Sequence, residues 1–158
     1  MKNKIKYVFY VCIISTIAFI WSQSCLSMEA SGNESDAVRE MMEKLFGTET
    51  AFAQFVSTYI RKIAHFTEFA LLGFEMTLFT YVCTKSKIND LFRCLVFGVA
   101  VAVTDETIQI FTGRGSSIFD VMIDTSGYIF AFLFASLLYF VIANSVRTIE
   151  ERKKYKNV

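Results

Sequence analysis

Apolar residues fall in four long blocks along the chain, each about as long as a bilayer is thick, roughly 20 residues. The blocks lie at about 6–26, 59–83, 91–111 and 118–142, and hydrophobic residues make up 54% of the sequence. The chain contains no proline that would break a helix. Strand-like alternation is absent, and an open sheet edge is not tolerated in lipid. The sequence therefore predicts an all-α membrane protein, a single domain over residues 1–158 built as a bundle of four transmembrane helices.

The first block has a rival interpretation. The basic start "MKNKIK" followed by an apolar run resembles a secretory signal peptide. However, Trp21 and Gln23 fit a cleavage site before Cys25 poorly, and the apolar run is long. We therefore predict that this helix is retained.

The distribution of charge predicts the orientation in the membrane. Most of the 16 Lys and Arg residues lie in the N-terminal tail, near the connection at 84–90 and in the tail at 143–158. With four helices these segments share one side, which the positive-inside rule assigns to the cytoplasm. The long connection at 27–58 is mainly acidic and is predicted to be extracellular. Both termini should therefore be cytoplasmic, and Cys25 is the one cysteine expected outside, where it cannot form an intramolecular disulfide.

A shorter apolar pattern lies within the predicted extracellular connection. Apolar residues recur with helical spacing in "SDAVREMMEKLF", residues 35–46. This pattern predicts an amphipathic extracellular helix between the first two spans. It would lie on the outer membrane surface as a lid or pack on the bundle.

Ionisable residues interrupt three of the spans. One helical stripe in the second span contains Arg61, His65, Glu68, Leu72 and Glu75. In the third span Asp105 and Gln109 share a face, and Glu106 should point about 100° away. The fourth span carries Asp120 and Asp124, followed on the same stripe by Gly127, Ala131 and Ala135.

These polar groups should meet inside the bundle, because a charge that faces lipid costs about 2.5–3.5 kcal/mol on an insertion scale. In the predicted topology they all lie in the outer half of the membrane. Arg114 would sit above them in a tight turn for which Gly113 and Gly115 supply the backbone freedom. The sequence thus predicts an outward-facing polar pocket, with Glu75 either as its floor or as a protonated carboxyl hydrogen-bonded to a neighbouring helix.

Two segments resemble a known family. "RKIAHFTEFALLG" and "DETIQIFTGRGSSIFDVMIDTSG" are similar to the two motifs of the VanZ-like family of bacterial membrane proteins, named for the teicoplanin-resistance protein of enterococci. The ending "FIWSQS" of the first span is a weaker match. The family's motif residues correspond here to Arg61, Lys62, His65, Phe66, Glu68, Asp105, Glu106, Gln109, Arg114, Ser117, Asp120 and Gly127. Phe69 stands where the family often has Tyr, and Asp124 where it often has Asn.

The resemblance implies a multi-pass protein of the bacterial plasma membrane that contributes to teicoplanin-type antibiotic resistance. We expect it to bind an envelope lipid, a lipoglycopeptide or a lipid-linked cell-wall precursor, and no nucleic acid. The candidate binding residues are Arg61, Lys62, Gln109, Arg114, Ser117, Asp120 and Asp124.

Other roles for the same residues remain open. A membrane enzyme could use His65, Glu68, Asp105 and Glu106 for acid–base chemistry on a lipid-linked molecule. A small ion-coupled transporter would need a polar path past Glu75. Alternatively, the carboxylates could pair with the basic residues and serve only to hold the helices together.

The sequence predicts no cofactor. It has no P-loop, dinucleotide or GxSxG motif. A divalent metal held by His65, Glu68, Asp105 and Asp120 is a less favoured alternative, because di-metal helical bundles use the order Glu-x-x-His and the order here is reversed.

Overall fold

The computed structural model is all-helical, as predicted, with helices α1 (Lys2–Ser24), α3 (Ala51–Cys83), α4 (Ile88–Phe111) and α5 (Ile118–Lys156). The structure describes residues 2–26, 36–37, 40–41, 44–45, 47, 51–84, 88–113 and 115–156. Each of the four helices is long and apolar enough to cross a membrane. The amphipathic helix predicted over 35–46 lies largely outside the described residues.

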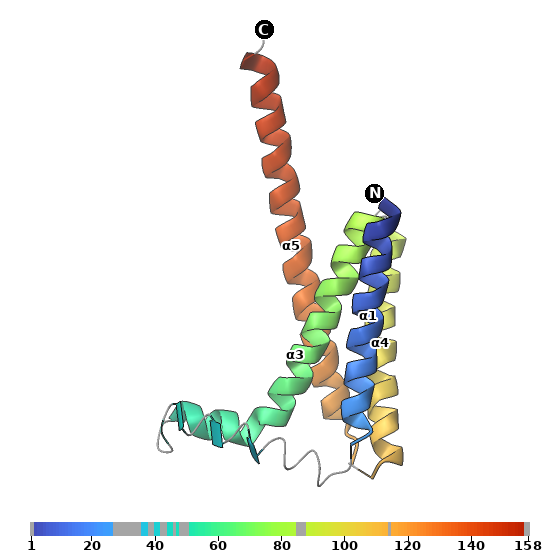
Figure 1. Ribbon diagram of the computed structural model, residues 1–158, viewed down its shortest axis with the longest axis vertical. Helices are drawn as coiled ribbons and strands as arrows, with labels where there is room; N and C mark the ends of the chain where they lie inside the picture. Colours follow the sequence, from blue (N-terminus) through green and yellow to red (C-terminus); the bar gives the residue numbers. More distant parts are fainter. Residues whose placement is uncertain are drawn as a thin grey trace.

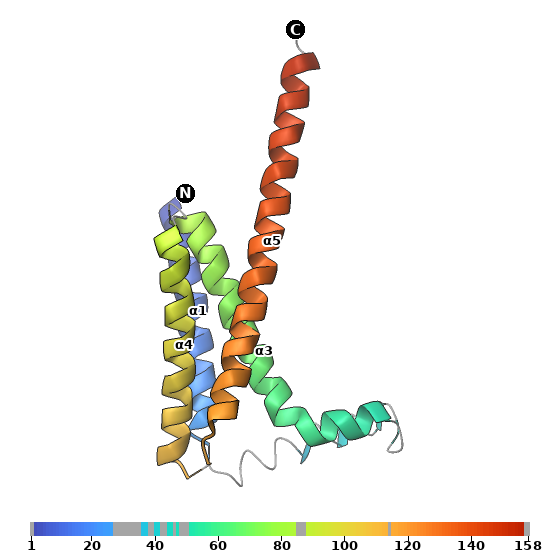
Figure 2. The same cartoon turned by 180° about the vertical axis from the view of Figure 1, so that it is seen from behind.

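The helices run alternately up and down. α1 and α4 run in one direction, α3 and α5 in the other, and the two chain ends point to the same side of the bundle (Figure 1). α3 and α4 each contact both α1 and α5. The opposite end of the bundle is therefore where α1 ends, α4 ends and α5 begins (Figure 2). This end is where the site described below lies.

Two helices are longer than the predicted spans. α3 begins at Ala51 rather than near residue 59, and its first part bends away from the bundle (Figure 1). α5 continues through the segment predicted as a tail and projects beyond the other helices as an exposed helix. Arg147 and Glu151, one turn apart on this extension, form an ion pair of 3.2 Å.

The crossing of α3 and α5 depends on two glycines. A Cβ at Gly73 would collide with the carbonyl oxygen of Tyr128, and a Cβ at Gly127 would collide with the carbonyl oxygen of Phe66. Each helix thus supplies a glycine against the other helix's backbone. Small residues allow such close approach between membrane helices, which lack a hydrophobic driving force toward each other. The predicted stripe of small residues is confirmed, since Gly127, Ala131 and Ala135 are all buried.

Tyr128 fills the space where α3, α4 and α5 meet. Its hydroxyl donates a hydrogen bond of 2.7 Å to the carbonyl oxygen of Cys94 and lies 3.2 Å from the Cys94 Sγ. Its ring packs against Gly98 of α4. The core is small, and most large apolar side chains, such as Phe130 and Leu137, point outward. An apolar exterior is what a lipid environment requires.

Candidate functional site

All four helices contribute side chains to one buried group of polar residues. We call this group the polar cluster; it consists of Ser24, His65, Asp105, Glu106, Gln109 and Asp124. Ser24 is the last residue of α1, so the cluster lies toward the end of the bundle where α1 ends, opposite the chain termini (Figures 1 and 2). Three carboxylates are buried in it, with Asp105 and Asp124 0% exposed and Glu106 3% exposed. The sequence prediction that these acids turn inward is consistent with this arrangement.

Asp105 is held by two neutral donors. The Ser24 hydroxyl donates a hydrogen bond of 2.7 Å to Oδ1. The Gln109 amide donates one of 3.0 Å to Oδ2 from the next turn of the same helix. The carboxylate is thereby fixed between α1 and its own helix.

Glu106 is held in a similar way on the neighbouring face of α4. The Gln109 amide donates to its Oε1 at 3.0 Å, and the backbone N–H of Ser117 donates to its Oε2 at 3.2 Å. Adjacent helix positions do point about 100° apart. Both side chains are nevertheless buried, because α1 covers Asp105 and the start of α5 covers Glu106. Gln109 bridges the two.

His65 joins α3 to the acids of the other helices. Its Nδ1 lies 3.4 Å from Asp124 Oδ1 and 3.8 Å from Asp105 Oδ2. The side chain is 14% exposed and is thus nearly enclosed. Phe66 follows His65 on α3, and Gly127 lies one turn after Asp124 on α5. The backbone contact between Phe66 and Gly127 therefore brings His65 close to Asp124.

Asp124 differs from the other two acids. Neither of its carboxylate oxygens has a hydrogen-bond donor, although the side chain is completely buried. His65 Nδ1 also lacks a hydrogen-bond partner of good geometry. The pair is therefore close in space but only weakly connected.

The cluster has the composition of a cation site or a proton-holding site. One atom each from His65, Asp105, Glu106 and Asp124 can be chosen so that all four lie within 4.8 Å of one another. Imidazole and carboxylate groups bind divalent metals, and the same groups exchange protons in acid–base catalysis.

The remaining predicted site residues lie outside the polar cluster or at its edge. Arg61 and Lys62 are exposed, and Asp120 is half-buried one turn before Asp124. Ser117 lies at the edge, where its backbone binds Glu106 and its Oγ accepts a hydrogen bond of 3.1 Å from the N–H of Phe119, as expected of a helix cap. Arg114 lies outside the described residues. Gly113 and Gly115 beside it have φ of 72° and 75°, as the predicted turn requires.

Glu68 and Glu75 lie near residues of α1, and the Glu68 charge is also close enough to act on His65. Glu68 lines a hollow of about 420 Å³ between α1 and α3, together with Ser15, Thr16, Phe19, Thr67 and Leu71. The walls of this hollow are mainly apolar. Glu75 is half-buried two turns further along α3, within hydrogen-bonding reach of Thr16.

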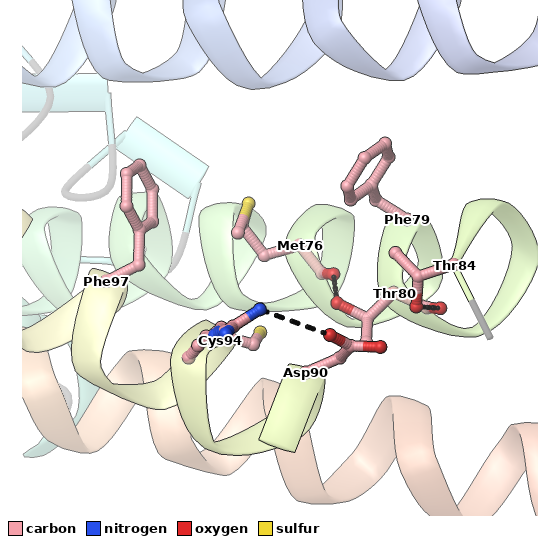
Figure 3. A pocket seen from close by; sticks show the side chains of 8 residues that line it. Met76, Phe79, Thr80, Thr84, Asp90, Cys94 and Phe97 are labelled. Carbon is pink, nitrogen blue, oxygen red and sulfur yellow. Dashed lines mark hydrogen bonds and ion pairs between the residues drawn. The ribbon is translucent and has the colours of Figure 1, made fainter. Parts of the chain in front are cut away.

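A second hollow, of about 260 Å³, lies at the other end of the bundle between α3 and α4 (Figure 3). Met76, Phe79 and Phe97 line it together with Asp90, whose carboxylate pairs with Arg93 at 3.8 Å. No member of the polar cluster reaches it. The two hollows share no lining residue and are therefore separate features.

Ser24 is the site residue that the sequence did not identify. It is completely buried, and it contacts Asp105 and Gln109. Its backbone carbonyl also accepts a hydrogen bond of 3.0 Å from the Thr112 hydroxyl. The available signal was the weakly matching "FIWSQS" ending, but a serine at the end of a span is ordinarily a solvated residue.

Comparison with known families identifies a relationship that covers most of the chain. A family model described as VanZ/LLP1 matches residues 7–140. Neither curated proteins nor solved structures give a match. The matched region contains every member of the polar cluster.

Proposed function

Because the chain belongs to the VanZ/LLP1 family of membrane proteins, we propose that it binds an envelope lipid or lipoglycopeptide at the outer face of the bacterial plasma membrane. Binding there contributes to resistance against teicoplanin-type antibiotics. The polar cluster and the hollow beside it are the proposed binding region.

The observation that carries this proposal is the burial of three carboxylates in one cluster built from all four helices. Ionisable groups inside a membrane are costly and are retained mainly for function. Polar residues that only hold helices together are usually neutral groups such as Ser, Thr, Asn and Gln. A cluster with three buried acids exceeds what helix association needs.

The hollow between α1 and α3 supports a lipidated ligand. Phe19 and Leu71 give it apolar walls, and Glu68 places a polar group on its lining. An acyl chain in the hollow would bring an attached head group next to the polar cluster. Teicoplanin carries an acyl chain, whereas vancomycin does not, which favours the former as a ligand.

The charge distribution supports placing this region on the outer side. Among the described side chains, the basic residues near the start of α1, near the start of α4 and on the α5 extension lie at the end opposite the cluster: Lys4, Lys6, Arg93, Arg147 and Arg152. The positive-inside rule puts that end in the cytoplasm. The cluster then faces the leaflet where cell-wall precursors are assembled and glycopeptides act.

A second candidate is a membrane enzyme acting on a lipid-linked molecule. It is favoured by His65, whose Nδ1 faces both Asp124 and Asp105. A histidine between carboxylates is a common general acid–base arrangement. His65 would transfer the proton and Asp124 would orient the ring.

The test is drug susceptibility in a Gram-positive host that lacks its own copy. Wild type is compared with His65→Ala and Asp105→Asn at equal membrane levels, for teicoplanin and vancomycin. Asp90→Asn is the matched control, since Asp90 lies on the same helix as Asp105 but at the other end. We expect selective protection against teicoplanin by wild type and Asp90→Asn, and its loss in the two cluster variants.

Other outcomes distinguish the alternatives. Full protection by both cluster variants would show that the cluster only holds the helices together. A modified lipid or drug in extracts of the wild-type strain, absent with His65→Ala although ligand still binds, would establish the enzyme. No protection by wild type would contradict the resistance role.

A further inference from the structure

We propose that the polar cluster binds one divalent transition-metal cation, with His65, Asp105, Glu106 and Asp124 as its protein ligands. The inference concerns the ion held by the cluster and does not depend on which lipid or drug the protein binds. It also differs from the less favoured metal set considered from the sequence, because Glu106 and Asp124 replace Glu68 and Asp120.

The first argument is the geometry of the donor atoms. All four lie within 4.8 Å of one another. Two ligands on opposite sides of a metal are separated by about twice a bond length, or about 4.2 Å for bonds of about 2.1 Å. The donor atoms are thus close enough to share one ion, and they would have to move together by about 0.6 Å or more to coordinate it.

The second argument is the state of Asp124. Both of its oxygens are buried without a hydrogen-bond donor, and His65 Nδ1 beside them has no hydrogen-bond partner either. A buried polar atom without a partner costs roughly 1–3 kcal/mol, and a charged one costs more. A cation between His65 and Asp124 would satisfy these atoms together. A proton shared between the two would satisfy at most one oxygen.

The third argument is the support of the other two acids. Asp105 receives hydrogen bonds from Ser24 and Gln109, and Glu106 receives them from Gln109 and the Ser117 backbone. A carboxylate oxygen has more than one lone-pair site, so a carboxylate that accepts such hydrogen bonds can also coordinate a cation. Metal-binding carboxylates are commonly oriented by such outer hydrogen bonds. Ser24 and Gln109 would therefore be positioning residues.

Charge points in the same direction. The cluster contains three carboxylates, and His65 is the basic group in contact with Asp124 among the described residues. A divalent cation offsets most of this negative charge at the place where it is concentrated. Offsetting it matters more here than at a surface, because water screens buried charges poorly.

The ligand types select the class of metal. Carboxylate oxygens suit Mg²⁺, Ca²⁺ and Mn²⁺, whereas imidazole suits Zn²⁺, Fe²⁺, Ni²⁺ and Cu²⁺. One imidazole with three carboxylates favours Mn²⁺, Fe²⁺ or Zn²⁺ over Ca²⁺ and Mg²⁺. Neither Cys12 nor Cys94 belongs to the set, so the softest metals are not favoured.

The test uses the full-length protein purified in detergent, freed of metal with a chelator and then titrated with Zn²⁺, Mn²⁺ or Co²⁺. Bound metal is counted by elemental analysis after gel filtration, and Co²⁺ ligation is followed by visible absorption. The ligand variants are Asp124→Asn and His65→Gln. Glu75→Gln is the matched control, because Glu75 is an intramembrane acid of α3 outside the cluster.

We expect about one tightly bound ion per wild-type or Glu75→Gln chain, and affinity lower by more than about tenfold in both ligand variants. Circular dichroism and the gel-filtration volume identify any variant that fails to fold. If one ligand variant fails to fold, the other still tests the proposal. Folded Asp124→Asn and His65→Gln proteins that bind metal as wild type does would overturn the proposal. Wild-type protein that binds no metal above the level of an unrelated membrane protein would also overturn it.

Discussion

The three buried acids of the polar cluster have different partners, and this difference separates their roles. Asp105 and Glu106 accept hydrogen bonds from neutral donors on α1, on α4 and at the start of α5. Neither oxygen of Asp124 has a hydrogen-bond donor, and His65 Nδ1 lies 3.4 Å from its Oδ1. Hydrogen bonds therefore fix the first two acids, whereas the Asp124 carboxylate oxygens and His65 Nδ1 lack hydrogen-bond partners and can bind a ligand.

Ser24 offers a test of this hydrogen-bond network. Ser24→Ala removes the 2.7 Å bond to Asp105, and we expect it to lower the free energy of unfolding by about 0.6 kcal/mol, the average for such bonds between membrane helices. Reversible unfolding by SDS in mixed micelles measures this change. Ser22→Ala is the control, since Ser22 is exposed and bonds only to the Phe19 carbonyl of its own helix. Equal losses in the two variants would contradict a specific role for Ser24.

Glu75 tests the transporter alternative. A polar ion path through the bundle would have to pass this half-buried carboxylate, which lies near Thr16 and away from the polar cluster. We expect Glu75→Leu to protect against teicoplanin as well as wild type does, because the binding proposal gives Glu75 no role. The measurement is the minimum inhibitory concentration at equal membrane levels. Loss of protection in a correctly inserted Glu75→Leu protein would favour an ion-coupled mechanism.

At the level of helices, the α3–α5 crossing determines whether a site exists. Gly73 and Gly127 allow the two backbones to touch, and Gly127, one turn after Asp124, contacts Phe66, the residue that follows His65. Side chains from different helices can meet only where those helices approach closely. The two glycines thus set the distance between the α3 and α5 backbones, and this distance determines whether the side chains of the site can meet.

Gly127→Ala tests this coupling. The added Cβ would collide with the Phe66 carbonyl oxygen, and overpacking of this kind costs about 1–3 kcal/mol. We expect lower stability against SDS together with weaker metal binding and weaker protection. Ser126→Ala is the control, because Ser126 is exposed on the adjacent position of α5. A Gly127→Ala protein that matches this control in all three measurements would show that the close crossing is not required.

At the level of the whole molecule, the alternating direction of the helices separates two chemically different ends. The chain termini and most basic residues lie at one end, and the polar cluster lies toward the other. α5 is the longest of the four helices, and its 39 residues, like the 33 of α3, exceed the roughly 20 needed to cross a bilayer. Its basic extension gives the bundle a long exposed helix on the side of the termini.

The native cysteines can test the proposed orientation. Cys25 is exposed just beyond the end of α1, at the cluster end, whereas Cys94 is buried. We expect a membrane-impermeant maleimide to label Cys25 in intact cells. Cys25→Ser should abolish that labelling, and permeabilised cells give the reference level. Labelling of intact cells that persists in Cys25→Ser, or that requires permeabilisation, would contradict an outward-facing cluster.

The sequence by itself determined the elements of this protein. Long apolar blocks without proline can satisfy their backbone groups in lipid only as helices, so the all-helical architecture with four long apolar helices followed from local composition. The family could also be recognised, because its two motifs are contiguous around His65 and between Asp105 and Gly127. The sequence also predicted that the charged side chains of the spans face the interior of the bundle, because a charge that faces lipid is costly.

The tertiary structure alone decided which polar groups meet. Helical spacing predicts the face on which each residue lies but not the rotation of one helix relative to another. The sequence therefore offered Asp120 and Asp124 alike, and the packing at Gly127 places Asp124 next to His65. Ser24 could be indicated only by the weakly matching "FIWSQS" ending, because its role depends on Asp105, which lies 81 positions away in sequence. The helices are properties of short segments, whereas the site is a property of how those segments pack.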